Sequence, residues 1–390
     1  MLKLGVIGMG LRAHDFLCET MNSIDPDFRI ACIVDPAVES ARNYLRDCDK
    51  KDTVFYDSVE ELLKNAKPDG IFVGTRCNLH TPMAIALEKY GVPIYLEKPV
   101  ATSMEQALEL ERVFRRSKTP VVVSFPLRVT PLCEKAKAII RSGAIGEVLH
   151  VTGLNYVPYG CVYFEVGYRN YAVTQGLFLQ KATHDFDYMM ELAGSPITRI
   201  SANWLRGRVF GGQKPGDLVC SQCPEAKDCR ESTRNRIKNC VGGVHTDHLC
   251  VFSEACGNPQ DGINEDASNA IFEFANGAIG TYAQVFFTRR QGQRGATVSG
   301  PLGRVSFDWY TNELQHIEHY QPFNGTYAAD NGQGHFGGDH VLAQNFHDLI
   351  EYGTPSISTI QAGLRSVFTC LAAKEAAATG KTVDVHQIDW

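Results

Sequence analysis

The sequence predicts an α/β domain with a doubly wound parallel sheet, followed by an α+β domain with an open, mostly antiparallel sheet. Two observations support this prediction. Up to residue 123, short apolar runs alternate with stretches that can be helical, which is typical of parallel β-α-β units. From residue 149 onward, strand-like runs follow one another mostly without helices between them, which favours antiparallel pairing. We therefore expect one domain over residues 1–123 and a second over residues 124–390.

The individual elements follow from these patterns. The first domain should contain buried strands at residues 2–8, 28–34, 70–74, 93–96 and 120–124, with helices at 13–22, 58–65, 80–90 and 103–116. The second should contain strands at residues 149–155, 197–205, 269–274, 278–287, 295–299 and 303–309. Asn276-Gly277 signals a hairpin turn between two of these strands, and helices at 341–352 and 360–379 close the chain.

The first strand ends in a glycine turn typical of dinucleotide binding. A Gly-x-Gly-x-x-Ala motif begins at Gly8 and leads into a helix. Gly8 allows a tight turn, Gly10 lets the backbone approach a pyrophosphate, and Ala13 permits close packing of helix on strand. The pyrophosphate would lie at the helix N-terminus, so we expect Leu11 and Arg12 to lie beside it. These features define a Rossmann domain.

An acidic residue follows the second predicted strand. Asp35 lies about 20 residues past the glycine turn, where a carboxylate is expected to bind the adenosine ribose 2′-OH. A carboxylate at this place would repel the additional phosphate of NADP, and Pro36 and Ala37 supply no arginine to receive one. We therefore predict NAD as the cofactor.

The composition argues against several classes of protein. The chain has 390 residues, 44% of them hydrophobic, which is enough for two domains with cores of their own. Lys and Arg number 38 against 44 Asp and Glu, and this acidic balance argues against binding nucleic acid or an anionic membrane. No apolar run approaches the roughly 18 residues of a membrane span, and the chain begins directly with a strand pattern. We expect a soluble, cytoplasmic protein.

Several further segments resemble one enzyme family. Glu97-Lys98-Pro99 follows the fourth predicted strand, and the others lie at residues 75–80, 127–131, 143–147 and 335–339. Together with the glycine turn they resemble the glucose–fructose oxidoreductase / inositol dehydrogenase / MocA (Gfo/Idh/MocA) family. The resemblance spans nearly the whole sequence except a Cys-rich insertion at about residues 205–260. It implies a homodimer or homotetramer that acts with NAD on a small carbohydrate.

The resemblance also implies roles for individual residues. In the family, the lysine of the Glu-Lys-Pro segment lies beside the nicotinamide and the substrate hydroxyl, which implies that Lys98 relays a proton or poises hydride transfer by its charge. Oxidation of a carbinol needs such a group, because the hydroxyl proton must leave when the hydride does. The expected cofactor contacts are Thr75, Arg76, His80, Glu97 and Lys98, and an expected substrate contact is Arg128.

The segment around His184 resembles the family's catalytic helix, usually Asp-x-Gly-x-His-Asp-x-Asp. His184 takes the place of the family's histidine, whereas Gln180 replaces the usual aspartate and Lys181 stands beside it. On a helix these three side chains can face one cleft, and a nearby lysine would favour a neutral imidazole. We expect His184 to act as general base or acid, with Lys181 as a further catalytic residue. Asp185 could cap or solvate the helix surface, and Asp187 could orient His184 or pair elsewhere.

An aromatic-rich stretch precedes this helix. Tyr156, Tyr159, Tyr163 and Tyr168 lie close together in the sequence, beside Arg169. Such a composition is expected of a loop that stacks on sugars, although aromatic residues are equally core material. We expect Tyr163 and Arg169, with Gln180 and His184, to contact the substrate.

Six of the thirteen cysteines fall within residues 220–256. Cys220, Cys223, Cys229 and Cys240 could supply four thiolates to a structural zinc, with His245 and His248 nearby. An iron–sulfur cluster is a second interpretation, although no complete ferredoxin spacing is present. Free thiols or disulfides are the third, and disulfides would need an oxidising compartment. The sequence leaves these three interpretations open.

Three functions are consistent with these features. The first is an NAD(H)-dependent oxidoreductase acting on a hydroxyl of a sugar, polyol or sugar derivative, in which Lys98 and His184 handle the proton. The second is a glycosidase that retains NAD, oxidises a glycoside transiently, eliminates the aglycone and returns the hydride. The third is a non-catalytic sensor of NAD and a sugar. The Glu97-Lys98-Pro99 segment and His184 argue against a sensor, because sensing needs no proton relay.

Overall fold

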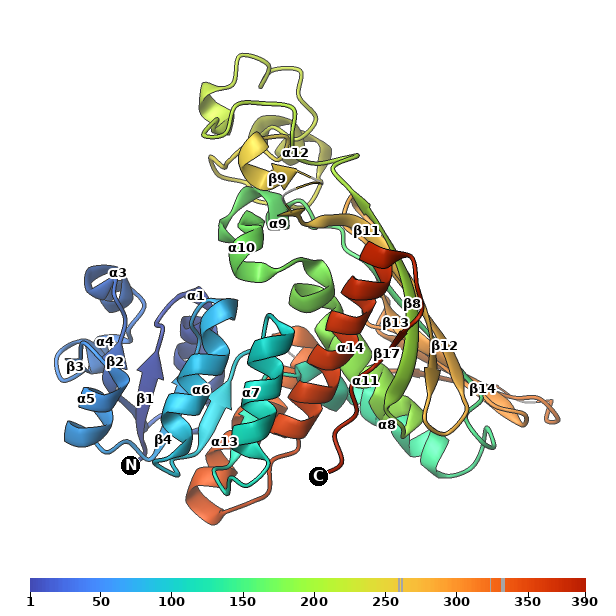
Figure 1. Cartoon of the computed structure of the whole chain (residues 1–390), viewed down its shortest axis with the longest axis horizontal. Coiled ribbons are helices and arrows are strands. Elements are labelled where there is room, and N and C mark those ends of the chain that lie inside the picture. Colours follow the sequence, from blue (N-terminus) through green and yellow to red (C-terminus); the bar gives the residue numbers. More distant parts are fainter. Residues whose placement is uncertain (259, 261, 323, 331–333) are drawn as a thin grey trace. The chain divides into compact units, whose positions relative to one another are not determined.

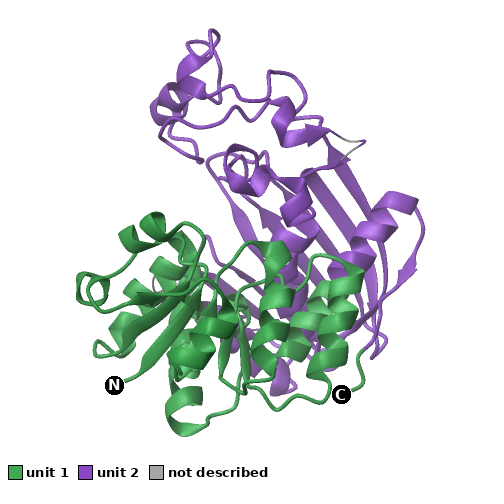
Figure 2. Cartoon of the chain, turned by 60° about the vertical axis from the view of Figure 1, so that its left-hand side comes forward, with its two compact units in different colours: residues 1–131, 331–368, 388–390 green, residues 132–330, 369–387 purple. Residues whose placement is uncertain are grey.

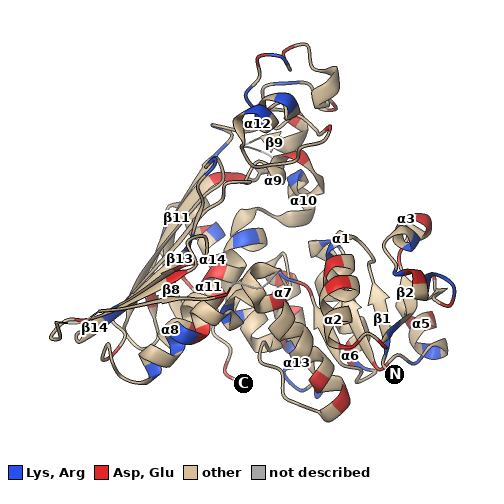
Figure 3. Ribbon diagram, turned by 180° about the vertical axis from the view of Figure 1, so that it is seen from behind, with Lys and Arg blue, Asp and Glu red and all other residues tan. Residues whose placement is uncertain are grey.

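A computed structural model describes residues 1–258, 260, 262–322, 324–330 and 334–390. The chain forms two compact units (Figure 2). Unit 1 contains residues 1–131, 331–368 and 388–390, and unit 2 contains residues 132–330 and 369–387. Basic and acidic residues are interspersed along the ribbon of both units (Figure 3). Within the described part of the chain, no helix combines the length and apolar character that crossing a bilayer would require.

Unit 1 contains a six-stranded, all-parallel sheet with the order β3-β2-β1-β4-β5-β6 (Figure 1). Its strands are β1 (Lys3–Ile7), β2 (Arg29–Val34), β3 (Val54–Phe55), β4 (Gly70–Val73), β5 (Ile94–Leu96) and β6 (Val121–Val123). The connecting helices are α1 (Leu11–Ala13), the π-helical η1 (His14–Met21), α2 (Asn22–Ile24), α3 (Val38–Asn43), α4 (Asp47–Lys50), α5 (Val59–Asn65), α6 (His80–Glu88) and α7 (Met104–Phe114). This arrangement confirms the predicted Rossmann fold, to which the structure adds β3, α3 and α4.

Serine caps fix where two of these helices begin. The Ser58 side chain accepts a hydrogen bond from the backbone N–H of Glu61 at the start of α5. The Ser103 side chain does the same for Gln106 at the start of α7. Each cap satisfies a backbone donor that has no partner within its helix, so the sequence sets these boundaries locally.

The C-terminal part of the chain returns to unit 1. Helix α13 (Gly338–Tyr352) supplies Phe346 to the core of this unit, where its ring centroid lies 5.6 Å from that of Tyr95. Tyr95 also packs against Phe16 and Phe72, at centroid distances of 4.1 and 5.3 Å. The expected boundary at residue 123 therefore describes only the first part of unit 1. The apolar face of α13 is the physical reason for the return.

Unit 2 contains a nine-stranded sheet with the order β16-β15-β14-β13-β7-β12-β11-β8-β17. All adjacent pairs are antiparallel except β7 and β12, so the predicted mostly antiparallel sheet is confirmed. The strands are β7 (His150–Tyr156), β8 (Ile197–Arg206), β11 (Glu265–Phe274), β12 (Ile279–Val285), β13 (Gln293–Ser299), β14 (Gly303–Asp308), β15 (Glu313–Glu318), β16 (Asn324–Ala328) and β17 (Val383–Asp384). Gly277 turns the hairpin between β11 and β12 at a φ of 87°, as its turn signal predicted.

Helix α11 (Thr183–Ala193) packs on one face of this sheet. Phe186 of the helix contacts Phe272 and Tyr282 of the sheet, at ring-centroid distances of 5.9 and 5.1 Å. A Cβ atom on Gly153 of β7 would lie 2.5 Å from the sulfur of Met189, so the glycine leaves room for this methionine side chain between helix and strand. Nearly every residue of α11 is buried as a result.

The Cys-rich insertion leaves the sheet between β8 and β11. Its regular elements are short: η6 (Cys220–Gln222), α12 (Thr233–Asn239), η7 (Glu254–Cys256), β9 (Gly257–Asn258) and β10 (Gly262–Ile263). Part of it joins α9 (Val162–Glu165) in a small core of its own, which includes Phe164, Phe210, Val251 and Cys256. The insertion is therefore a packed subregion of unit 2.

The packing of α13 on the first sheet gives a prediction. Phe346→Ala removes a fully buried ring, so we expect the free energy of unfolding to fall by about 3–5 kcal/mol. Thermal and chemical denaturation of both proteins would measure the loss. The matched control is Tyr352→Ala, at the exposed end of the same helix, with an expected change within about 0.5 kcal/mol. A Phe346→Ala loss no larger than that of the control would contradict the assignment of α13 to the core of unit 1.

Candidate active site

The glycine turn of unit 1 has the geometry that a pyrophosphate requires. Gly8 has a φ of 85°, and a Cβ atom there would lie 2.8 Å from the backbone nitrogen of Thr75, so only glycine fits. A Cβ atom on Gly10 would meet nothing within 4 Å, which leaves open space at the start of α1. Leu11, in the first turn of that helix, is 62% exposed. A negatively charged group could approach the backbone here without displacing protein atoms.

The carboxylate of Asp35 is held at the end of β2 by two backbone groups. It accepts hydrogen bonds of 2.8 Å from the N–H of Met9 and from the N–H of Ala37. The first of these bonds joins Asp35 directly to the glycine turn. Because a carboxylate can accept about four hydrogen bonds, these two leave capacity for a ribose diol. The residues present therefore fit the adenosine end of NAD.

Arg12 has different surroundings from those expected of a cofactor contact. Its guanidinium donates to Glu97 Oε1 at 2.6 Å and to both carboxylate oxygens of Asp339 at 2.7 and 2.9 Å. His335 Nδ1 lies 2.8 Å from Asp339 on the other side. The charged groups of Arg12 and Glu97 are thus paired with each other, and they join the glycine turn to the end of β5 and to α13. That Arg12 and Glu97 bind the cofactor stays a prediction.

This buried network shifts the pKa values of its carboxyl groups. Burial alone would raise the pKa of Glu97, but the charges of Arg12 and Lys98 lower it by more, so the pKa lies below its ordinary value. Burial likewise raises the pKa of Asp339, and hydrogen bonds from His335 and Arg12 hold it well below the usual range. Both groups are thus carboxylates at neutral pH.

Lys98 and residues 75–76 lie at the carboxyl ends of adjacent parallel strands. Thr75 and Arg76 follow β4, and Lys98 follows β5 by two residues. Lys98 is partly exposed, Thr75 is partly exposed and Arg76 is exposed. Ligands of parallel sheets bind at this edge, so the fold brings these three residues to the place that the sequence predicted.

His80 is held between the segments that follow β4 and β5. It is 2% exposed, and its ring nitrogens lie 2.8 Å from the carbonyl oxygen of Pro99 and 3.1 Å from that of Thr75. Burial lowers the pKa of His80, so the ring is neutral and only one of the two nitrogens donates. His80 therefore links the segments after β4 and β5, and its contact with the cofactor stays a prediction.

The predicted catalytic segment of unit 2 begins with a π-helical turn, η5 (Phe178–Ala182), in place of a regular α-helix. Such turns are frequent at functional sites. Gln180 and Lys181 lie in this turn and are buried. The ammonium group of Lys181 donates to the hydroxyl of Tyr159 at 2.9 Å, and it also lies 5.9 Å from the ring centroid of Tyr163. Tyr159 was not among the predicted substrate contacts, and only its position in the aromatic-rich stretch hinted at it.

His184 follows in the first turn of α11 and is 3% exposed. Its neighbour Asp185 does not cap or solvate the helix surface, because it is fully buried. Asp185 accepts hydrogen bonds from Asn155 at 2.7 Å, Tyr282 at 2.6 Å and Arg294 at 2.9 Å. These partners belong to β7, β12 and β13, so Asp185 fixes the helix, and with it His184, against the sheet.

The network around Asp185 fixes the protonation of its donors. Burial raises the pKa of Tyr282, and the negative charge of Asp185 raises it further. The Tyr282 phenol therefore keeps its proton and remains a donor.

Asp187 is also buried, at 1% exposure, which does not fit a solvated position. Arg294, which neutralises Asp185, lies far from the helix in the sequence, and no motif marks it.

Two further predicted substrate contacts have different neighbours. Arg128 is buried in unit 1, and its guanidinium donates to the backbone carbonyl of Ile357 at 3.4 Å. Arg169 lines a cavity of unit 2 together with Tyr171 and Cys256, and that cavity does not include Tyr163, Lys181 or His184. The structure therefore groups Tyr163 with Lys181 and Tyr159, and separates Arg169 from them.

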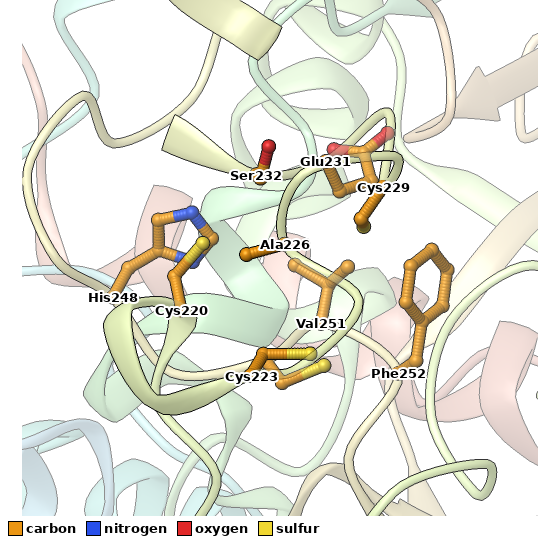
Figure 4. A pocket seen from close by; sticks show the side chains of 10 residues that line it. Cys220, Cys223, Ala226, Cys229, Glu231, Ser232, His248, Val251 and Phe252 are labelled. Carbon is orange, nitrogen blue, oxygen red and sulfur yellow. The ribbon is translucent and has the colours of Figure 1, made fainter. Parts of the chain in front are cut away.

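The cysteines of the insertion converge in part. Cys220, Cys223, Cys229 and Cys250 line one cavity, which we call the four-cysteine cavity (Figure 4). Burial raises the pKa of Cys250, and the neighbouring thiols raise it further. Cys240, the predicted fourth zinc ligand, is exposed at the end of α12 and does not line the cavity. The fourth cysteine of the cavity is therefore Cys250. Residues 219 and 249 pair as an isolated β-bridge, and this pairing places Cys250 near Cys220.

The geometry of this cavity does not fit zinc. Tetrahedral zinc with Zn–S bonds of about 2.3 Å holds its sulfur ligands about 3.8 Å apart. Among the described residues, no three of the ligand atoms offered by these cysteines and His248 lie within 4.8 Å of one another. The zinc interpretation is therefore not supported.

Comparison with known proteins gives the class first. A profile described as "Oxidoreductase family, NAD-binding Rossmann fold" matches residues 2–125, and a "GFO/IDH/MocA C-terminal domain" profile matches residues 133–306. The fold and the cofactor turn thus define an oxidoreductase with an NAD-binding Rossmann domain. Because the two matches cover most of the sequence, the chain belongs to the Gfo/Idh/MocA family, as its motifs implied.

Individual relatives are distant. "Putative oxidoreductase YteT" of Bacillus subtilis (strain 168) is 24% identical over 318 residues, which is 74% of each chain. "Inositol 2-dehydrogenase" of Corynebacterium glutamicum (strain R) is 24% identical over 204 residues, or 52% of this chain and 57% of the relative. The solved structure "Levoglucosan dehydrogenase, complex with NADH and levoglucosan" has a TM-score of 0.75 at 20% identity and covers 99% of this chain and 100% of its own.

The position of Asp35 gives a prediction about cofactor choice. Asp35→Asn removes the negative charge but keeps an oxygen that can accept from Met9 or Ala37. We expect the preference for NADH over NADPH, measured as a ratio of Kd values by nicotinamide fluorescence, to fall about tenfold or more, or about 1.4 kcal/mol. The control is Asp52→Asn, on the surface of unit 1. An unchanged ratio of the Kd values in Asp35→Asn would show that this carboxylate does not distinguish the ribose 2′-OH of NADH from the 2′-phosphate of NADPH.

The Arg12 network gives a prediction about pH. The folded-state pKa values of Glu97 and Asp339 lie below their unfolded values of about 4.3 and 3.9. The network therefore makes its full contribution to the stability of the folded state above about pH 5, and this contribution decreases as pH falls. Arg12→Met leaves buried carboxylates without their cation, and we expect a loss of about 3 kcal/mol at pH 7. Without Arg12, burial raises their pKa values, so this loss should shrink as pH falls to 4.

Denaturation midpoints of both proteins between pH 4 and pH 7 would measure the effect. The matched control is Arg115→Met, because Arg115 pairs with Asp389 at 2.6 Å on the surface, where both side chains are mostly exposed. Its expected loss is under about 1 kcal/mol. A deficit in Arg12→Met that stayed constant or grew on acidification would contradict the buried ion-pair network.

Proposed function

We propose that this protein transfers a hydride between NAD and a carbinol carbon of a sugar, polyol or sugar derivative. The proposal depends on three features that lie together at the carboxyl-end edge of the parallel sheet. These are the open glycine turn, the Asp35 carboxylate that backbone N–H groups hold in place, and Lys98. Family membership supports the use of NAD. The names of the inositol and levoglucosan dehydrogenases support the substrate class.

Lys98 is proposed as the group beside the nicotinamide. When bound, NAD supplies the hydride acceptor, and the protein must take up the proton of the reacting hydroxyl. Lys98 follows a buried strand at the ligand-binding edge of the sheet, and its charge is close enough to lower the pKa of Glu97. A lysine in this position can donate to the substrate oxygen and stabilise the negative charge that develops on it.

His184 is proposed as the general base for oxidation and the general acid for reduction. Its support is the anchored position of α11, because three bonds to Asp185 hold the helix in place next to it. Lys181 and Tyr159 are proposed to bind the substrate beside His184. The Lys181 ammonium donates a hydrogen bond to the Tyr159 phenol oxygen, and a substrate hydroxyl could donate to this pair or accept from it. Tyr163 would offer an apolar face to the sugar ring.

We further propose a homodimer or homotetramer in the cytoplasm. The nine-stranded sheet exposes Ile271 at 62% and Ile279 at 54%, on β11 and β12, and apolar side chains on an open sheet face favour assembly.

The proposed roles can be tested with a panel of substrates. With NAD and a panel that includes myo-inositol, scyllo-inositol and levoglucosan, we expect NADH formation from at least one compound. His184→Asn and Lys98→Met should each lower kcat by about 10²–10⁴-fold, because each removes a proton-transfer group. The matched controls His319→Asn and Lys64→Met change exposed residues and should retain wild-type rates.

Two outcomes would contradict the proposal. Wild-type rates in His184→Asn would remove this residue from the mechanism. Cleavage of a nitrophenyl glycoside without net formation of NADH, by protein purified with NAD bound, would establish the redox-assisted glycosidase instead.

A further inference from the structure

The four-cysteine cavity lies outside the proposed catalytic residues and calls for its own explanation. Its cysteines come from three separate stretches of a polar insertion, and the backbone brings them together. The N–H of Cys220 donates to the carbonyl of His248 at 2.8 Å, and the N–H of Cys250 donates to the carbonyl of Leu218 at 2.9 Å. Cys223 follows in the turn after Cys220, and Cys229 ends the turn that starts at Glu225. Four thiols thus converge without forming a disulfide.

The four cysteines line a largely apolar cavity. Figure 4 shows the side chains of Cys220, Cys223 and Cys229 around those of Ala226 and Val251, with Phe252 to one side. The volume between these lining residues is about 280 Å³ when the part that is open to solvent is included. Four thiols turned toward an apolar gap gain little from one another, because thiols are weak hydrogen-bond donors and acceptors. A thiophilic metal centre would use all four.

A second group points to a ligand in the same place. His248 lines the cavity and is 6% exposed, and its Nδ1 lies 2.9 Å from the carbonyl of Leu249. In the described part of the chain, its buried Nε2 has no hydrogen-bond partner. A buried polar atom without a partner costs about 1–3 kcal/mol, which a bound polar or ionic group would offset.

The spread of the sulfur atoms distinguishes between metal centres. The ligand atoms are too far apart for a single tetrahedral zinc. A cubane cluster distributes four irons over its corners, with one thiolate on each, and so holds its ligands farther apart than one ion does. We propose that the four-cysteine cavity binds a [4Fe–4S] cluster through the thiolates of Cys220, Cys223, Cys229 and Cys250.

Binding is balanced in atoms and charge. The four thiols lose their protons to solvent, and the four thiolates bind a preformed [4Fe–4S]²⁺ core delivered from a cluster donor, with no net oxidation or reduction. The product is a dianionic centre.

The cluster would organise the insertion and, through it, the aromatic stretch. Arg236 of α12 pairs with Glu165 of α9 at 2.5 Å, and both side chains are fully buried. Glu165 also accepts from the N–H of Val244 at 3.0 Å. Helix α9 carries Tyr163, which contacts Lys181. Loss of the cluster should therefore loosen α9 as well as the insertion.

The test is metal analysis of the full-length protein purified without oxygen. We expect about four irons and four acid-labile sulfides per chain, a broad visible absorption and an EPR signal after reduction with dithionite. Cys220→Ser and Cys250→Ser should each lower the iron content at least about fivefold. Cys240→Ser is the matched control in the same insertion and should retain wild-type iron.

Wild-type protein decides the question even where a variant fails to fold. About one zinc per chain without sulfide would overturn the cluster. So would failure to bind iron and sulfide during anaerobic incubation with ferrous iron and sulfide. Loss of iron in Cys240→Ser with retention in Cys250→Ser would overturn the proposed ligand set.

Discussion

The ion pairs of Arg12 are the interaction on which unit 1 most depends. One guanidinium joins the glycine turn, the end of β5 through Glu97 and the start of α13 through Asp339. A buried charge is tolerated only when it is paired and hydrogen-bonded, so these three segments must fold together. The consequence reaches the proposed chemistry, because Lys98 is the next residue after Glu97. The backbone that presents Lys98 is thus held by the same contacts that hold the cofactor turn.

Unit 2 uses the same principle around Asp185. The carboxylate sits on the helix, its donors Asn155, Tyr282 and Arg294 sit on three neighbouring strands, and the whole network is buried. Directional bonds of this kind fix the rotation of α11 more strictly than apolar packing alone. His184 precedes Asp185, so its backbone position is determined with it. In both units a residue proposed for proton transfer is the sequence neighbour of a buried carboxylate that is held by an arginine.

The sequence could predict what depends on local pattern. Both sheets, the glycine turn with Asp35 and the position of Lys98 follow from strand periodicity and from short motifs. The partners of Arg12, His80 and Asp185 could not be predicted, because some of them lie hundreds of residues away in the sequence. In addition, the sequence of a motif is the same whether its residue binds a ligand or another side chain. Polar, partly exposed strands such as β15 and β16 also lack an apolar signal. Cys250 was missed as the fourth cysteine because spacing alone favours Cys240.

The proposed function requires transfer of hydrogen between a sugar carbon and NAD. The most direct measurement is to incubate the protein with NAD and with polyols and sugars deuterated at their carbinol carbons, and to examine the nicotinamide by NMR. We predict that deuterium from the substrate appears at C4 of the nicotinamide ring. A nicotinamide that remains unlabelled while the sugar is converted, or that remains unlabelled with every compound of the panel, would contradict the proposed function.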